Sequence, residues 1–290
     1  MVNGNRESST QKVLNIGKDF VREFTDKVAV EEPMEIRLVY PDSGGYSTEA
    51  VTTLMRTPGE DFELAAGFLY TEGVLDSYDA IADINYCVGE NGFQEFNMVN
   101  VTITSKQQAH FHNVDRSFYT SSGCGVCGTR TIEGLREKYE RGGALDLDES
   151  YPLLGEEQIF ELPDKLREMQ SLFDTTGGVH AAGLFDGEGT LIDIKEDVGR
   201  HNAVDKVIGS QLRRYRMPLS EYVLVVSSRA SYDIVQKAIR ARVPFVVAVG
   251  APSSLAIDLS ARYGLTMVGF ARGNSFNVYA GHGRIRIPGQ

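Results

Sequence analysis

Two cysteines flanked by glycines are the residues of this 290-residue chain with the clearest capacity for chemistry. Cys124 and Cys127 lie in the segment SSGCGVCGTRTIEG, residues 121–134, ahead of a stretch with helical periodicity. Metal binding, disulfide exchange and sulfur transfer all use cysteines at this spacing. Since a helix N-terminus lowers the pKa of a nearby thiol, the position also favours the reactive thiolate.

The sequence lacks part of what a zinc site would need and part of what a disulfide oxidoreductase site would need. Structural zinc is held by four protein ligands, typically from two cysteine pairs, and this chain has one such pair. Cys87 and the histidines of HFH, residues 110–112, do not lie at a recognised ligand spacing. A thioredoxin-type pair would follow a strand directly, whereas a polar stretch precedes this one. The glycines predict an uncovered loop that suits sulfur transfer between partners; a tight turn with two buried cysteines is the structural alternative.

The composition excludes several classes of protein. A formal net charge of −11 disfavours a general nucleic-acid binder, so an anionic ligand would have to be held by a local arrangement of residues. No apolar run approaches the ~20 residues of a membrane helix, and the polar first residues lack the apolar segment of a secretory signal. Three cysteines do not make a disulfide framework, and Cys87 is interpreted as a small buried apolar residue. We therefore expect a soluble, cytoplasmic protein with no nucleic-acid or membrane partner.

The chain divides into three predicted parts. Residues 1–28 are polar and are expected to form a flexible N-terminal extension. Residues 29–118 are predicted to form a small α+β domain, and residues 119–290 a larger α/β domain that carries the cysteine loop. In the small domain, alternating apolar residues around the turn PDSGG predict a hairpin over 28–53, and a helix is expected in RTPGEDFELAAGFLYTEGVL. Its other expected strands are 81–88 and 97–103.

Alternating strands and helices in the C-terminal third indicate a parallel sheet with right-handed crossovers. Predicted strands are TLIDI, YVLVVSS, FVVAV and LTMVGF, with helices between them. Asp197 and Ser231 are expected to cap two of these helices, a serine at 253 or 254 to cap the third, and Gly264 to end it. A further helix is predicted over 160–173.

Small and polar residues follow three of these strands, where ligands bind in open α/β sheets. The segments are SSRAS (227–231), GAPSS (250–254) and ARGNS (271–275). Two of them lead into helix N-termini, and two contain an arginine, Arg229 or Arg272, so this edge suits a phosphate-bearing ligand. Helix capping and turn formation would explain the same residues without a ligand.

Two histidines lie in segments that could contribute to such a site. His180 follows paired glycines in TGGVHAAG, and His201 lies between Asp197 and Asp205 at the helical spacing i, i+4 and i+8. Carboxylates on the same helix face as a histidine can fix its tautomer and raise its pKa. A structural histidine at position 180 and a solvated, salt-bridged face over 197–205 are the alternatives.

Six motifs together resemble the formate dehydrogenase accessory sulfurtransferase family, FdhD. They run in order and at family-like spacing from about residue 30 to about residue 282: RTPGEDFELAAGFLYTEGVL, SSGCGVCG, TGGVHAAGLF, EDVGRHNAVDKVIG, SSRASYDIVQKA and GFARGNSFNVYA. The resemblance implies a cytidine-deaminase-like, three-layer C-terminal domain with a smaller α+β N-terminal domain, and a homodimer. Gly123, where many members carry serine, is a departure that would loosen the loop without removing its chemistry.

The resemblance also implies a function. A member of this family takes sulfur from a cysteine desulfurase as a persulfide and passes it to the bis(molybdopterin guanine dinucleotide) molybdenum cofactor before insertion into formate dehydrogenase. Cys124 matches the persulfide-bearing cysteine, with Cys127 as its partner in relay or resolution. The cofactor would be bound as a substrate, with no permanent cofactor and no metal site in the protein itself. The family's cofactor contact matches Phe270, Ala271, Arg272, Gly273, Asn274 and Ser275.

Residues near this contact are expected to assist cofactor binding and proton handling. Ser228 and Arg229, at the neighbouring strand end, would help to bind the dinucleotide phosphates, and His180 or His201 is hypothesised to handle protons.

Two other functions are considered. A zinc nucleobase deaminase would share the implied fold, but it needs H-x-E and P-C-x-x-C motifs. HFH contains no such glutamate, and Gly123 stands in place of the proline. A non-catalytic chaperone that binds a nucleotide or the cofactor for the apoenzyme is the other alternative.

Overall fold

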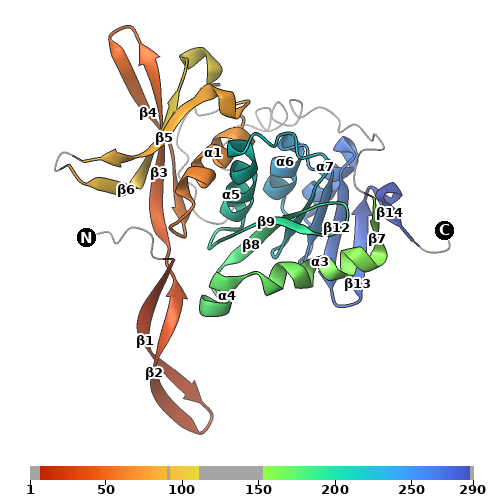
Figure 1. Cartoon of the computed structure of the whole chain (residues 1–290). Helices are drawn as coiled ribbons and strands as arrows, with labels where there is room; N and C mark the ends of the chain where they lie inside the picture. The colour runs from red at the N-terminus through yellow and green to blue at the C-terminus, as the bar shows by residue number, and fades with distance from the viewer. Residues whose placement is uncertain (1–6, 90–91, 111–152, 288–290) are drawn as a thin grey trace.

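The computed structural model describes residues 7–89, 92–110 and 153–287. These residues include a two-stranded hairpin, a four-stranded sheet and a six-stranded sheet with helices on both of its faces (Figure 1). Cys124, Cys127 and the helix expected after them lie outside the described residues. The predicted domain boundary at 118/119 lies outside them too and stays a prediction.

The first described residues form a β-hairpin, a regular element that the sequence analysis did not predict within residues 1–28; the flexibility of this extension stays a prediction. Strands β1 (Ser8–Gly17) and β2 (Phe20–Ala29) pair antiparallel along their whole length. β-Branched and aromatic residues are interspersed with polar ones on both sides of the turn, and such residues are enriched in strands. In Figure 1 the hairpin projects away from the rest of the molecule, and most of its side chains are exposed.

The four-stranded sheet has the order β4-β3-β6-β5. Its first two strands, β3 (Glu32–Asp42) and β4 (Gly45–Arg56), confirm the predicted hairpin. The others are β5 (Ile81–Val88), which begins and ends where the sequence predicts, and β6 (Gln94–Ile103). Ile36 and Leu38 alternate with half-buried residues along β3 because one face of the sheet packs against the core. Cys87, in β5, is only partly buried.

The six-stranded sheet has the order β13-β12-β11-β10-β8-β9. The three central strands β10, β11 and β12 are parallel, as predicted. Strands β8, β9 and β13 are antiparallel to their neighbours, so the sheet is mixed. The bounds are β8 (His180–Phe185), β9 (Leu191–Asp197), β10 (Val223–Val226), β11 (Phe245–Ala248), β12 (Thr266–Arg272) and β13 (Ser275–Ala280).

Helices cover both faces of this sheet. On one face lie α5 (Arg200–Arg213), α6 (Tyr232–Arg240) and α7 (Ser254–Tyr263), and α3 (Glu156–Glu168) lies on the other (Figure 1). The single helix predicted over 160–173 is wrong, because α3 ends at Glu168 and a separate helix, α4 (Ser171–Thr176), follows. Two short strands, β7 (Leu154–Gly155) and β14 (Ile285–Arg286), pair beside α3. The α/β class is confirmed, while the cytidine-deaminase-like arrangement stays a prediction.

A close crossing of two helices joins the N-terminal sheet to the six-stranded sheet and its helices. Helix α1 (Asp61–Thr71) packs on α5, and a Cβ atom on Gly67 would lie 1.9 Å from the carbonyl oxygen of Asp205. One hydrophobic cluster therefore extends from Ile36, in β3, to Val246, in β11. The two predicted domains share this core. None of the helices in the described ranges combines the length and the apolar character that crossing a bilayer requires.

Candidate functional site

The topology brings most of the candidate residues to one edge of the six-stranded sheet. Because β10, β11 and β12 are parallel, the segments 227–231 and 250–254, which follow β10 and β11, lie at the same edge as 270–275, which contains the end of β12. Antiparallel β8 begins at this edge with His180, and β9 ends there immediately before α5. We call these three segments, with His180 and the first turn of α5, the strand-end site.

Backbone hydrogen bonds connect the three segments. The Gly250 N–H donates to the carbonyl oxygen of Ser228 over 3.1 Å, and the Phe270 N–H donates to that of Gly250 over 3.1 Å. A Cβ atom on Gly250 would lie 3.0 Å from the backbone of Arg229, so the close approach requires glycine here. The Ser228 side chain is buried and donates to the carbonyl oxygen of Arg229, so it supports the loop. The Arg229 side chain is exposed.

The third segment comprises the last residues of β12, the turn at 273–274 and the first residue of β13. Phe270 has a φ of 53°, in the left-handed region, and the residue is 38% exposed. The Arg272 guanidinium lies 6.0 Å from the centre of the Phe270 ring. Ala271 is buried, whereas Gly273, Asn274 and Ser275 are exposed. Because strained backbone gathers at functional sites, the exposed ring and cation are candidates for ligand contact.

Ser231 begins α6 as predicted, but its hydroxyl does not cap the helix. It lies 3.2 Å from Nε2 of His201, which is also 3.7 Å from the carboxylate of Asp233. Ser253, in contrast, accepts a hydrogen bond from the Ala256 N–H and caps α7 as predicted. Both serines therefore lie at helix starts, but only the Ser253 hydroxyl caps its helix, whereas the Ser231 hydroxyl contacts a histidine.

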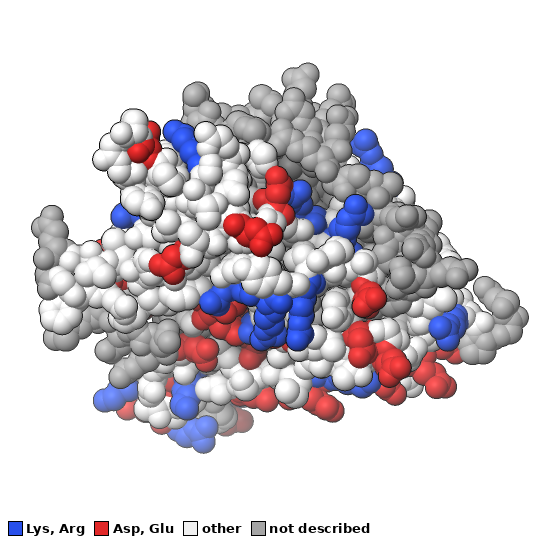
Figure 2. All heavy atoms as spheres, turned by 45° about the horizontal axis from the view of Figure 1, so that its top comes forward, with Lys and Arg blue, Asp and Glu red and all other residues white. Residues whose placement is uncertain are grey.

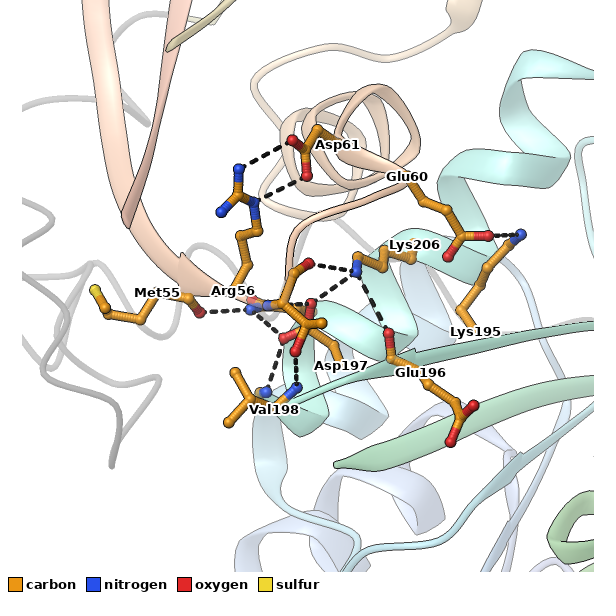
Figure 3. A network of polar contacts seen from close by, with 12 residues as sticks. Met55, Arg56, Glu60, Asp61, Lys195, Glu196, Asp197, Val198 and Lys206 are labelled. Atoms are coloured by element: carbon orange, nitrogen blue, oxygen red, sulfur yellow. Dashed lines mark hydrogen bonds and ion pairs between the residues drawn. The ribbon is translucent and has the colours of Figure 1, made fainter. Parts of the chain in front are cut away.

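The prediction that Asp197, His201 and Asp205 share a helix face is wrong. Asp197 is the last residue of β9, and the helix begins at Arg200, after Gly199 at the N-cap. The Asp197 carboxylate accepts hydrogen bonds from the N–H groups of Thr57 and Gly199, not from an imidazole. Figure 3 shows this carboxylate beside the ammonium group of Lys206. The prediction that Asp197 caps α5 is therefore wrong, because Gly199 occupies the N-cap position.

The third member of that set, Asp205, is also turned away from His201. Its carboxylate accepts a hydrogen bond from the hydroxyl of Thr71 and pairs with the ammonium of Lys237 at 2.9 Å. Burial lowers the pKa of Lys237, but Asp205 and Glu72 outweigh it, so the net pKa is raised and the ammonium stays charged. The pair joins α1, α5 and α6 beneath the strand-end site.

The pKa values of both histidines are lowered, which contradicts the expected increase at His201. Burial is the largest cause for His201, and the cations Lys237 and Arg200 add to it, so the pKa falls to about 3. Burial and Arg200 likewise lower the pKa of His180, with Asp197 opposing. Both imidazoles are neutral at pH 7 and can act as hydrogen-bond donors or acceptors.

The lowered pKa of His201 predicts a loss of stability in acid. Its pKa in the folded protein, about 3, is below its ordinary value of 6.5, so the unfolded chain takes up the proton first. The free energy of unfolding should fall as the pH drops from 6.5 towards 3, by up to ~1.4 kcal/mol per pH unit. Urea unfolding between pH 7 and pH 4 should show a shallower decline for His201→Asn. Parallel pH profiles for the two proteins would contradict the prediction.

Sequence reasoning missed Arg200. This arginine is the first residue of α5 and contributes to the lowered pKa of both His180 and His201. The available signal is its place directly before His201 in VGRHNA.

Positive charge is concentrated in one region of the surface. Figure 2 shows Lys and Arg side chains gathered near the centre of one face, with acidic side chains around them. A net charge of −11 therefore leaves room for positive regions.

The mixed sheet, its connected strand ends and the arginines at one edge define an α/β protein with a candidate ligand site beyond the carboxyl ends of its parallel strands. The chain belongs to the FdhD/NarQ family, whose model matches residues 29–286. The family resemblance noted from the sequence is thereby confirmed.

Relatives and a solved structure are similar over most of the chain. A sulfur carrier protein FdhD of Streptomyces avermitilis is 45% identical over 285 residues, which cover 97% of each chain. The sulfur carrier protein FdhD of Mycobacterium tuberculosis is 39% identical over 282 residues, covering 95% of this chain and 97% of that one. A crystal structure from Desulfotalea psychrophila, assigned provisionally as a formate dehydrogenase accessory protein, has a TM-score of 0.71 at 26% identity and covers 97% of this chain and 100% of that one.

Proposed function

We propose that this protein is a sulfurtransferase that carries sulfur as a persulfide on Cys124 and delivers it to a molybdenum cofactor for formate dehydrogenase. The observation that carries the proposal is the likeness to sulfur carrier proteins over nearly the whole chain. A cysteine desulfurase is the proposed donor. The bis(molybdopterin guanine dinucleotide) form of the cofactor is the proposed acceptor and is a substrate here. We also propose a cytoplasmic homodimer.

The sulfur chemistry needs a thiolate and no external oxidant. The Cys124 thiolate attacks the terminal sulfur of the donor persulfide, a new S–S bond forms on Cys124, and the donor cysteine leaves as a thiolate. The proton of the donor's terminal sulfur stays with that sulfur. Cys127 would then relay the sulfur or resolve the persulfide, and both roles suit a thiol three positions away.

The strand-end site supports the proposed binding of a molybdenum cofactor that carries guanine nucleotides. Arg229 and Arg272 are exposed cations there, and α6 and α7 begin at the same edge with backbone N–H groups that favour phosphate. The exposed ring of Phe270 offers a flat surface for a guanine base. Neutral His180 and His201 would donate or accept hydrogen bonds near the bound cofactor.

Intact mass spectrometry after incubation with a cysteine desulfurase and cysteine tests the proposal. Wild-type protein should gain ~32 Da, one sulfur, and lose it with a reductant. Cys124→Ala should gain nothing, because it has no thiolate at the attacking position. Cys127→Ala serves as the matched control, since it removes a thiol from the same loop and leaves Cys124 in place. Sulfur on Cys124→Ala, or on none of the three proteins, would contradict the proposal; the second result would favour a cofactor-binding chaperone.

A further inference from the structure

The connector between β4 and α1 is bonded to the turn between β9 and α5, although about 140 positions separate them in the chain. The Thr57 N–H donates to the Asp197 carboxylate over 3.1 Å, and the Thr57 hydroxyl oxygen accepts the Val198 N–H over 3.1 Å. From the other side, the Asn202 amide donates to the carbonyl oxygen of Met55 over 2.8 Å. Figure 3 shows the two segments facing each other.

A buried lysine lies beneath this junction. The Lys206 ammonium contacts the Asp197 carboxylate at 2.8 Å and donates to the carbonyl oxygens of Thr57 and Glu196. All three ammonium hydrogens therefore have acceptors, one in the connector and two at the end of β9. Figure 3 shows Lys206 reaching from α5 towards both. The junction is a satisfied polar network rather than a loose contact.

The connector itself is anchored on the N-terminal side. Arg56, next to Thr57, makes a bidentate contact with the Asp61 carboxylate, with distances of 2.9 and 3.0 Å. Asp61 is the first residue of α1 and also accepts a hydrogen bond from the Tyr86 hydroxyl, in β5. Because Arg56 and Asp61 are both buried, the connector has little freedom to move independently of the N-terminal sheet.

The turn that the connector holds leads directly into the strand-end site. Val198 and Gly199 precede Arg200 and His201, and a Cβ atom on Gly199 would lie 2.8 Å from the Asn202 side chain. A residue with a Cβ atom at this position would therefore displace the Asn202 side chain. A displacement of Val198 would be transmitted to the first turn of α5, which carries the cation and the imidazole of the site.

We propose that Thr57 is a positioning residue for the strand-end site: its hydroxyl fixes Val198 and thereby places Arg200 and His201 for binding of a diphosphate-bearing nucleotide. This inference rests on the proposed function for the nature of the ligand. It adds that the N-terminal sheet, which does not contribute to the strand-end site, influences the geometry of that site through the connector, and that the Thr57 hydroxyl is the side-chain group that holds Val198. Thr57 acts on the ligand only through the β9–α5 turn.

Guanosine diphosphate is the probe for the first experiment, with Thr57→Val and Thr57→Ser as a matched pair. Valine keeps the shape of threonine but cannot accept the Val198 N–H, whereas serine keeps the hydroxyl. Loss of one such hydrogen bond is worth ~1 kcal/mol, so isothermal titration calorimetry should show roughly fivefold weaker binding for Thr57→Val. Thr57→Ser should bind within about twofold of wild type. Asn202→Ala, which removes a different bond of the same junction, should also weaken binding and serves if Thr57→Val does not fold.

Titration of His201 by NMR is the second readout and needs no nucleotide. Asp233 and Lys237 of α6, Glu72 after α1, and the nearby Arg200 and Arg229 form the charged surroundings of the imidazole. A displaced turn should expose it, so its pKa should rise from about 3 towards 6.5 in Thr57→Val and stay low in Thr57→Ser.

The outcomes separate this inference from the proposed function. An unchanged His201 titration in Thr57→Val, or equally weak nucleotide binding by the valine and serine variants, would overturn the positioning role. Failure of wild-type protein to bind guanosine diphosphate would count against the nucleotide part of the proposed function. The His201 titration would then still decide whether Thr57 positions the turn.

Discussion

Replacement of Lys206 by methionine is expected to lower the free energy of unfolding by about 3–5 kcal/mol. The change leaves the Asp197 carboxylate, which is completely buried, without its cation. Two carbonyl oxygens, those of Thr57 and Glu196, lose a donor at the same time. Methionine has nearly the same length as lysine, so little packing is lost. Urea unfolding at pH 7, followed by circular dichroism, measures the effect.

Lys165→Met is the matched control for this experiment. The Lys165 ammonium also pairs with a carboxylate, that of Glu161, at 3.0 Å, but 40% of its side chain is exposed to solvent. Water solvates both partners once the exposed pair is broken, so the loss should stay below ~1 kcal/mol. Equal decreases in the free energy of unfolding for the two variants would mean that burial does not increase the contribution of the Asp197–Lys206 pair to stability.

Gly67→Ala is expected to destabilise the protein by about 3 kcal/mol, although alanine is normally the better residue in a helix by ~0.5–1 kcal/mol. The sign reverses because the added Cβ would lie 1.9 Å from the Asp205 carbonyl oxygen and 2.9 Å from the Gly209 nitrogen, both of them backbone atoms of α5. The helices would have to separate, and the core that joins the N-terminal sheet to the six-stranded sheet would open. The midpoint of urea unfolding is the measurement.

Gly44→Ala tests whether the crowding at Gly67 is responsible. Gly44 lies in the turn between β3 and β4, and a Cβ atom there would meet nothing within 4 Å. Its effect on stability should stay within about 0.5 kcal/mol of zero. A Gly67→Ala protein as stable as Gly44→Ala would show that α1 and α5 can separate at little cost, against the close crossing described here.

Most strands could be predicted because their signal is local. Residues 81–88 form β5 as predicted, and the apolar runs YVLVVSS and FVVAV contain the parallel strands β10 and β11. Strand burial imposes a period of two on a half-buried strand and a continuous apolar run on a fully buried one, and both are visible in sequence. The cap at Ser253 and the stop at Gly264, with a φ of 69°, depend on adjacent residues and were equally accessible.

The errors arise where distant groups decide the local structure. The helix predicted over 160–173 is interrupted because the Glu196 carboxylate, from β9, accepts the N–H groups of Leu172 and Phe173 and starts a new helix there. Asp197 looked like a helix cap, but donors from Thr57 and Lys206 hold it at the end of a strand. Neither partner is visible from spacing alone, since a hydrogen bond across the fold leaves no periodic pattern.

The sequence by itself determined the strand and helix alternation, the glycine- and serine-rich strand ends, and the family resemblance that includes Cys124 and Cys127. Each of these is a property of neighbouring residues. Only the tertiary structure decided that the strand ends meet at one edge with His180 and the start of α5, and that His201 is held neutral. Burial and the charges of Lys237 and Arg200 set that pKa, and both depend on how segments far apart in the chain pack together.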